Sequence, residues 1–335
     1  AFATLRGYHH HRLRFDRVGI GPGRRLRVTA HLAWRQWLND GYWGIGNGTT
    51  RERAYVGDLP DGDPARKRYR YSLFQPFGHV TLRARLLGAL SLFAAVNLKY
   101  SVVETYEGSL LAEQRPFGID GGLSMPLSAG VIYDSREPEV NPRTGIFAEL
   151  SGRVAGPLPG GAGTFGGVFA SVRGYLSVTT WLVLAGRLMA EQLVGEVPFY
   201  EMVHWGGSVP VAGFGGFETL RGVSFGRWRA PGKAILNAEA RFRLFEHTLF
   251  DRPMRWQLGL FADAGVVWGA GDDATAPAPD VPIHPAGGLG IRVIYQRLFV
   301  ARIDTGFGID PITEPDGSET IAPSFGLYIV FDQAF

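Results

Sequence analysis

The sequence predicts an all-β fold, a transmembrane antiparallel β-barrel, and three observations lead to this prediction. Apolar and polar residues alternate with a period of two over stretches of roughly 10–15 residues, longer than the strands of about 5–6 residues usual in soluble sheets. The polar face of these stretches is rich in Arg, Glu, Asp and Asn, as expected for a wet lumen. Aromatic residues lie near the ends of the stretches, where a barrel carries its interfacial girdles: Trp34, Trp37, Tyr100, Trp181, Trp256, Trp268 and Phe331.

Composition excludes several other classes of protein. The 335 residues include 47 Gly and 21 Pro, which disfavour helix interiors, and no Cys, which excludes disulfide scaffolds, thiolate zinc sites and thiol catalysis. The most apolar stretch, residues 86–98, is interrupted by Gly88, Ser91 and Asn97, so no run reaches the roughly 18 apolar residues of a membrane-spanning helix. The net charge of +3 is spread along the alternating stretches, so no nucleic-acid partner is predicted.

Thirteen strands can be counted, and the first lies at about His10–Val18. The clearest alternation occurs at residues 25–35, 89–102 and 234–244. The same pattern recurs at residues 146–154, 168–178, 182–188, 256–268, 289–293, 299–307 and 325–331. A soluble β-sandwich also alternates, but the long strands and the charged face favour a single barrel domain over residues 1–335.

Shorter and longer connections follow one another along the chain, which is typical of an outer-membrane barrel with short periplasmic turns and long extracellular loops. Thirteen is an odd number, whereas bacterial single-chain barrels have an even number of antiparallel strands. We therefore expect upstream strands, most simply three, which gives a barrel of sixteen strands overall. The alternative is that one strand has been split or overlooked and that the barrel has twelve or fourteen.

The longest connection, the predicted extracellular loop 194–232, contains a glycine-rich segment and Arg221. A phosphate-binding loop would need a strand–loop–helix context, which is absent. By alternation, Glu239 and Asp263 on the next two strands face the lumen, and an arginine folded back into the barrel could form charge-assisted pairs with them. From the residues alone, an inserted loop and a flexible surface loop both remain open.

Four short motifs lie at residues 134–145, 220–223, 261–265 and 324–335. In matching order, they resemble those of the BamA/TamA superfamily, the bacterial surface-antigen barrels of outer-membrane assembly. The element of residues 220–223 is similar to the Val/Leu-Arg-Gly-Phe/Tyr signature of the family's lumen-inserted loop, although Val223 replaces the usual aromatic residue: Leu220, Arg221, Gly222 and Val223. A second element resembles the Phe-x-Asp-x-Gly strand, whose acid pairs with the loop arginine in the family: Phe261, Asp263 and Gly265. Residues 42–47, Tyr-Trp-Gly-Ile-Gly-Asn, also resemble a loop of surface-antigen relatives.

Two further elements complete the resemblance, which spans residues 42–335. One is similar to the family's Asp-x-Arg and Pro-x-x-Gly periplasmic turn: Asp134, Arg136, Pro142 and Gly145. The other fits a terminal-strand assembly signal: Ser324, Gly326, Ile329, Phe331 and Phe335. The resemblance covers the barrel portion only, since nothing in residues 1–335 resembles a POTRA domain.

The resemblance implies a function in inserting or translocating outer-membrane or secreted polypeptides, in the outer membrane of a Gram-negative bacterium. An incoming strand would pair with a weak seam between the first and last strands. The implied partners are outer-membrane lipids or lipopolysaccharide, unfolded client polypeptides, and periplasmic or lipoprotein assembly factors. A passive pore, or the membrane anchor of a larger surface protein, is the alternative function. We predict no enzyme, because Ser208 and His204 lack a Gly-x-Ser-x-Gly elbow. We also predict no cofactor and no metal, because Asp272, Asp273 and Asp280 lack the spacing of a calcium loop.

Overall fold

The computed structural model describes residues 2–3, 9–57, 59–269, 283–295, 299–331 and 335. All of its strands belong to one sheet, in which β1, β4 and β7 contribute only two or three residues each. The strands are β1 (Phe2–Ala3), β2 (His9–Ile20), β3 (Leu26–Gly41), β4 (Arg51–Glu52), β5 (Arg70–Leu87), β6 (Leu90–Thr105), β7 (Gly122–Ser124), β8 (Leu127–Asp134), β9 (Gly145–Ala155), β10 (Phe165–Ser177), β11 (Leu182–Gly195), β12 (Gly232–Leu249), β13 (Arg252–Trp268), β14 (His284–Tyr295), β15 (Phe299–Thr313) and β16 (Glu319–Val330).

The helices in the described part of the chain are short. They are the 3-10 turns η1 (Pro22–Arg24), η2 (Arg53–Tyr55) and η3 (Pro64–Lys67) and the α-helix α1 (Leu110–Gln114). Among the described residues, no helix has the length and apolar character needed to cross a membrane.

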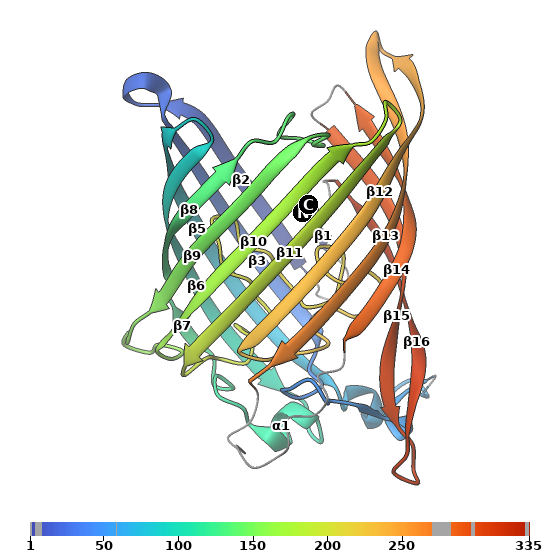
Figure 1. Cartoon of the computed structure of the whole chain (residues 1–335). Coiled ribbons are helices and arrows are strands. Elements are labelled where there is room, and N and C mark those ends of the chain that lie inside the picture. The colour runs from blue at the N-terminus through green and yellow to red at the C-terminus, as the bar shows by residue number, and fades with distance from the viewer. Residues whose placement is uncertain (1, 4–8, 58, 270–282, 296–298, 332–334) are drawn as a thin grey trace.

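The thirteen long strands pair with their neighbours antiparallel and in chain order, from β2 to β16. Figure 1 shows these tilted strands curving into a barrel wall. This arrangement confirms the predicted all-β antiparallel fold, and the number of long strands agrees with the number counted in the sequence. Within the described residues, no ladder joins β2 to β16. The sixteen-stranded total stays a prediction.

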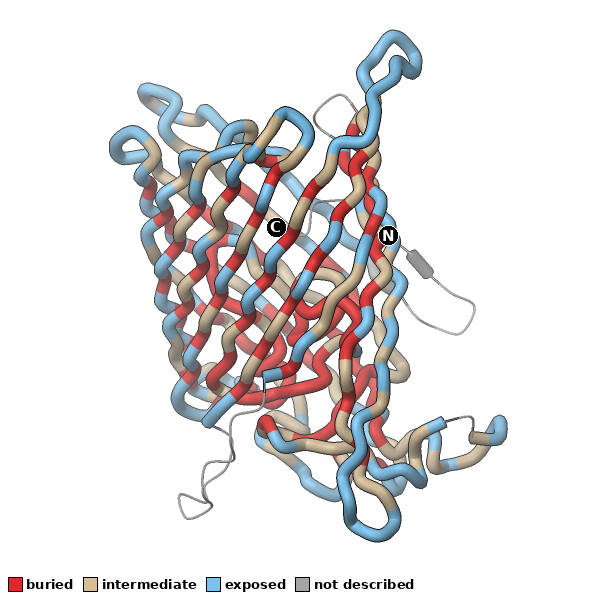
Figure 2. The backbone as a smooth tube through the Cα atoms, turned by 45° about the vertical axis from the view of Figure 1, so that its right-hand side comes forward, coloured by how far each residue is buried: buried red, intermediate tan, exposed pale blue. Residues whose placement is uncertain are grey.

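The two faces of the wall have opposite character, because side chains alternate along each strand. On β11, Leu184 and Leu188 are exposed on the outside, whereas Arg187 and Glu191 are buried inside. Figure 2 shows this alternation of buried and exposed positions on strand after strand. The lumen therefore holds the charged side chains, and the apolar outer face suits a lipid environment.

The connections at the two ends of the barrel also differ. Short turns gather at the upper end of the barrel in Figure 1, and longer connections gather at the lower end, which we call the long-loop end. The link between β12 and β13 is a turn of two residues, 250 and 251, and most of residues 310–323 belongs to β15 and β16. Pro323 is accommodated in β16 because an edge strand tolerates proline.

Trp37 was expected in an aromatic girdle, and this expectation was wrong. Trp37 lies two residues after the buried Arg35 and three after the exposed Trp34, so alternation along β3 places it on the lumenal face. Trp37 consequently lines a cavity inside the barrel, whereas Trp34 and Trp181 are half exposed on the outside.

We predict that the purified protein migrates faster on SDS gels when unheated than when boiled. A barrel whose backbone hydrogen bonds are satisfied within the wall resists SDS until it is heated. Equal mobility in both lanes, together with a helical far-ultraviolet circular dichroism spectrum, would contradict the fold.

Candidate functional site

The longest connection between described strands, residues 196–231 from β11 to β12, is folded into the barrel lumen, where Figure 1 shows it in yellow behind the wall. Several of its apolar side chains form a cluster with inward-facing side chains of β10 to β13. The loop contributes Trp205, Phe214, Leu220, Val223, Trp228 and Ala230, and the strands contribute Phe169, Met189, Ile235 and Val267. Because burial of each large apolar side chain is worth about 1.5–3 kcal/mol, this cluster holds the loop inside the barrel.

Arg221 of this inserted loop is 1% exposed, and two carboxylates of the wall bind its guanidinium. Its Nε and Nη2 donate to the two carboxylate oxygens of Asp263, each at 2.9 Å, and its Nη1 donates to Oε1 of Glu239 at 2.9 Å. The backbone N–H of Arg221 also donates to Asp263, at 3.1 Å. The structure thus brings together the three residues that the sequence analysis paired. It also resolves the open choice in favour of an inserted loop.

The Phe-x-Asp-x-Gly element of β13 supplies three different contacts to the loop. Phe261, Asp263 and Gly265 are spaced two apart, so all three face the lumen. The Cζ atom of Arg221 lies 3.5 Å from the centroid of the Phe261 ring, a cation–π contact. A Cβ on Gly265 would lie 3.0 Å from the Leu220 methyl carbons, so glycine leaves the space that Leu220 needs.

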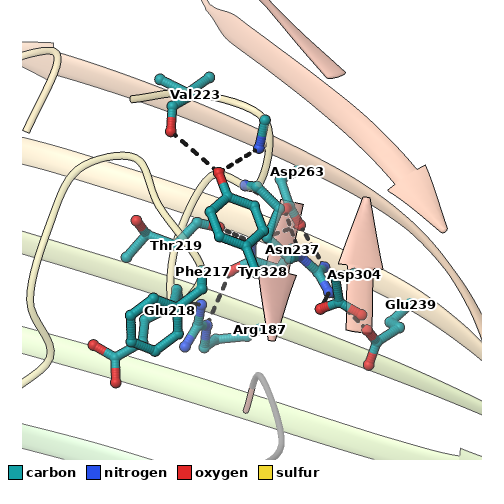
Figure 3. A network of polar contacts seen from close by, with 12 residues as sticks. Arg187, Phe217, Glu218, Thr219, Val223, Asn237, Glu239, Asp263, Asp304 and Tyr328 are labelled. Carbon is teal, nitrogen blue, oxygen red and sulfur yellow. Dashed lines mark hydrogen bonds and ion pairs between the residues drawn. The ribbon is translucent and has the colours of Figure 1, made fainter. Parts of the chain in front are cut away.

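Further arginines surround the same carboxylates. Glu239 also accepts hydrogen bonds from Nε of Arg241 at 2.7 Å and from Arg292, and Oδ2 of Asp304 lies 3.6 Å from Nη1 of Arg221. Figure 3 shows Glu239, Asp263 and Asp304 converging below the loop. Arg221 is the member of these ion pairs that the loop contributes, whereas the other three arginines, Arg241, Arg292 and Arg302, belong to strands of the wall.

Arg221 stays protonated at this buried position. Burial disfavours the charged guanidinium, but the carboxylates of Asp263 and Glu239 outweigh burial and raise the pKa of Arg221 above its ordinary value. Removing one partner of such a buried pair typically costs about 3–5 kcal/mol, since the other partner stays buried without compensation. The inserted loop is therefore held by an ion pair as well as by its apolar cluster.

The terminal strand β16 binds the next residue of the loop, Gly222. The Gly222 N–H donates to Oη of Tyr328 at 3.0 Å, and the Gly222 carbonyl accepts from Oγ of Ser324 at 2.7 Å. A Cβ on Gly222, whose φ is +105°, would lie 2.6 Å from the carbonyl carbon of Gly306 on β15. Glycine is therefore required at residue 222 and at residue 306 for the loop tip to reach the last two strands.

Val223, the departure from the family signature, is buried in the apolar cluster of the inserted loop. Its Cγ2 lies 2.7 Å from the point where a Cβ on Gly308 would be, so the valine packs directly over the backbone of β15. Its carbonyl lies 3.5 Å from Oη of Tyr328 (Figure 3). The β-branched side chain therefore completes the contact between the loop tip and the last two strands.

Residues 42–47 pack against the base of the inserted loop. The rings of Tyr42 and Phe199 meet edge to face with centroids 5.6 Å apart, and the Gly46 N–H donates to the carbonyl of Arg229 at 2.8 Å. Asn47 shares a hydrogen bond of 2.7 Å with His284 on β14. This motif therefore connects the inserted loop to the wall at the long-loop end.

The predicted turn motif lies at the opposite end of the barrel, away from the inserted loop. Arg136 donates to both carboxylate oxygens of Asp134, at 2.8 and 3.0 Å, and its Cζ lies 4.7 Å from the ring centroid of Phe147. Gly145 has a φ of +100°, and a Cβ there would lie 2.3 Å from a backbone oxygen, so the turn needs glycine. Pro142 is buried in the same turn.

The members of the predicted terminal-strand signal separate onto two faces. Ser324 and Gly326 face the lumen, whereas Ile329 and Phe331 are about 70% exposed on the outside. Phe335 is buried inside the barrel, with its carbonyl accepting from Nη2 of Arg241 at 3.2 Å. Only Ser324 and Gly326 therefore belong to the neighbourhood of the loop tip.

Sequence reasoning missed Tyr328, Arg227 and Asp310. Tyr328 follows Ser324 and Gly326 at the same two-residue spacing, so alternation places it on the lumenal face, but spacing does not reveal its bond to Gly222. Arg227 and Asp310 form a second buried pair between the loop and β15, with Nε and Oδ1 2.7 Å apart. No local pattern joins two residues so distant in the sequence.

The described residues contain no group of three or more His, Asp or Glu side chains arranged to hold a metal ion. Ser208, considered above with His204, donates its hydroxyl to a carboxylate oxygen of Glu149 at 2.7 Å. This bond fixes the loop to β9.

A barrel wall with a charged lumen and a loop anchored inside it by an arginine defines a class of outer-membrane-type barrels. The Omp85 superfamily domain matches residues 119–329, well over half of the chain. The chain belongs to the Omp85 superfamily.

Among solved structures, the chain is similar to one titled "The crystal structure of BamA from Haemophilus ducreyi lacking POTRA domains 1-3", with a TM-score of 0.58 and 15% sequence identity. The match covers 96% of this chain and 62% of that chain, less than two thirds of its length. At this identity the likeness concerns the fold alone. A comparison with curated proteins found no match.

We predict that Arg221→Ala and Asp263→Ala each weaken loop docking by about 3–5 kcal/mol and that the double variant is little worse than either single one. Each change breaks the same buried pair, so the effects overlap. The measurement is the rate of proteolysis within residues 196–231 in detergent. Arg243→Ala, at an exposed position on β12, is the matched control and is expected to leave that rate unchanged. Additive effects of the two changes would contradict the pairing.

Proposed function

We propose that this chain inserts or translocates outer-membrane or secreted polypeptides in the outer membrane of a Gram-negative bacterium. Membership of the Omp85 superfamily and likeness to the BamA barrel support this proposal. In this reading the barrel is not an enzyme, its short turns face the periplasm and its long loops face outside.

One observation carries the proposal: the tip of the inserted loop is bound at the same time to the wall and to the terminal strand. Arg221 is fixed by Asp263 and Glu239, and Gly222 is hydrogen-bonded to Ser324 and Tyr328 of β16. A movement of the loop therefore pulls on β16, and the position of β16 depends on the loop.

The terminal strand has the features of an edge that can accept another strand. Among the described residues, β16 is paired along one side, with β15, and its other side presents backbone donors and acceptors. Such an edge accepts an extended polypeptide by β-augmentation. Gly326 lies opposite Gly306 in the ladder, and a pair without side chains contributes little cross-strand stabilisation. Weak pairing at this point would let β16 move.

The proposed partners follow from the same geometry. Unfolded client polypeptides would pair with the edge of β16, and lipids or lipopolysaccharide would cover the exposed apolar side chains of the wall, such as Phe325 and Leu327. Periplasmic or lipoprotein assembly factors would meet the end of the barrel that carries the turn of Asp134 and Arg136. These assignments are part of the proposal.

A passive pore is the alternative function, and one observation favours it. A cavity of about 640 Å³ lies between the inserted loop, the wall from β2 to β6 and residues 325–328 of β16. Arg12, Arg35 and Lys99 are among its lining residues, which suits the passage of small anions. The apolar cluster of the loop fills the lumen beside the cavity, and this filling favours the first function over an open pore.

We predict that the protein, reconstituted in liposomes, accelerates the folding of an added unfolded outer-membrane β-barrel. Tyr328→Phe removes the hydroxyl that binds Gly222 and should lower the rate severalfold while the barrel stays folded. The matched control is Tyr100→Phe, which removes a hydroxyl from an outward-facing tyrosine of β6. An equal folding rate of the client in liposomes with and without the wild-type protein would contradict the function.

A further inference from the structure

A short segment of the connection between β3 and β5 reaches across to the far end of the sheet. Residues 49–53, which we call the strap, include β4, and β4 pairs in parallel with β15 through Arg51 opposite Ile312 and Glu52 opposite Thr313. Figure 1 shows this blue segment at the bottom of the view, running toward the lower ends of β15 and β16. The strap therefore links the wall that contains the first long strands with the wall that contains the last ones.

Two arginines from different parts of the chain meet on one carboxylate under the strap. Nε of Arg227, from the inserted loop, lies 2.7 Å from Oδ1 of Asp310, and Nη2 of Arg51, from the strap, lies 2.8 Å from Oδ2. Asp310 is 4% exposed and Arg227 is 1% exposed. Each carboxylate oxygen of Asp310 thus has its own cationic partner, in a site that water reaches poorly.

The strap and the inserted loop also bind each other directly. Nη1 and Nη2 of Arg227 donate to the hydroxyl and the carbonyl of Thr49, at 3.0 and 2.8 Å. Strap, loop and β15 therefore form a closed triangle around Arg227 and Asp310. A change at Asp310 must act on both the strap and the loop.

A second set of contacts lies at the exposed rim. Arg53 forms a bidentate pair with Glu314, with Nε–Oε2 and Nη2–Oε1 distances of 3.0 and 2.6 Å, and the hydroxyls of Thr50 and Thr313 are hydrogen-bonded. Exposed ion pairs contribute little and are screened by salt. The rim contacts therefore align the strap, whereas the buried contacts at Asp310 hold it.

We propose that Asp310 is the positioning residue of a gate at the long-loop end of the barrel. Its carboxylate holds the strap across the gap in strand order between β2 and β16 and ties the inserted loop to the strap. The lumen opens toward this end only when these bonds break. The inference goes beyond the proposed function, because the same gate would control a passive pore.

The test is the ion conductance of the whole chain in planar lipid bilayers. Asp310→Asn keeps the shape of the side chain but removes its charge and one of its two acceptor oxygens. We expect openings to become severalfold more frequent in this variant. Asp61→Asn is the matched control, because Asp61 belongs to the same connection, is paired with Arg66, and has a side chain that is 97% exposed. This control should behave like the wild type.

A reversible lock makes the test independent of the folding of any one variant. The chain has no cysteine, so Thr50→Cys with Thr313→Cys introduces the only thiols, at positions whose hydroxyls already touch. Oxidation should abolish the extra openings of Asp310→Asn, and reduction should restore them. If Asp310→Asn does not fold, the two-cysteine protein alone tests the gate: the openings of its reduced form should disappear on oxidation and return on reduction. Openings that are indifferent to both the Asp310 change and the lock would overturn the gate, whatever the outcome of the client-folding assay.

Discussion

The ion pair between Arg221 and Asp263 is the interaction on which the rest of the site depends. The apolar cluster places the loop in the lumen, but the charged groups of the loop need partners there, since burying an unpaired charge is costly. Asp263 meets the guanidinium and the backbone N–H of Arg221 together, and Glu239 meets the remaining edge of the guanidinium. With Arg221 fixed, Gly222 and Val223 pack over the glycines of β15, and Gly222 is hydrogen-bonded to the hydroxyls of β16.

Besides its bonds to β6 and β9, the loop has two attachments that reach the end of the sheet. Near its tip, Arg221 and Gly222 connect β12 and β13 with β16, and further along, Arg227 connects β15 with the strap. Both attachments end on the last two strands of the sheet. The inserted loop is thus placed to sense the position of the terminal hairpin, which supports a role in handling strands at that edge more than a role as a simple plug.

Much of the fold could be predicted because β-strands impose a period of two on the sequence. That period indicated the thirteen long strands, the lumenal placement of Glu239 and Asp263, and the charged interior. The contact of Tyr328 with Gly222 and the meeting of two arginines on Asp310 could not be predicted, because they depend on how a loop folds back through space. The girdle assignment of Trp37 was wrong because it relied on the position of Trp37 near a strand end, whereas the period of two places it, three residues after Trp34, on the lumenal face.

The central claim is that the loop arginine holds the terminal strand through Gly222. Hydrogen exchange of the backbone amides of β16 measures this most directly, in the wild type and in Arg221→Ala. The account predicts that the amides of residues 324–330 exchange faster in the variant, while those of residues 183–189 on β11, which lie between two paired neighbours, keep their protection. Unchanged protection of β16 in a variant whose loop has become open to proteolysis would contradict the claim.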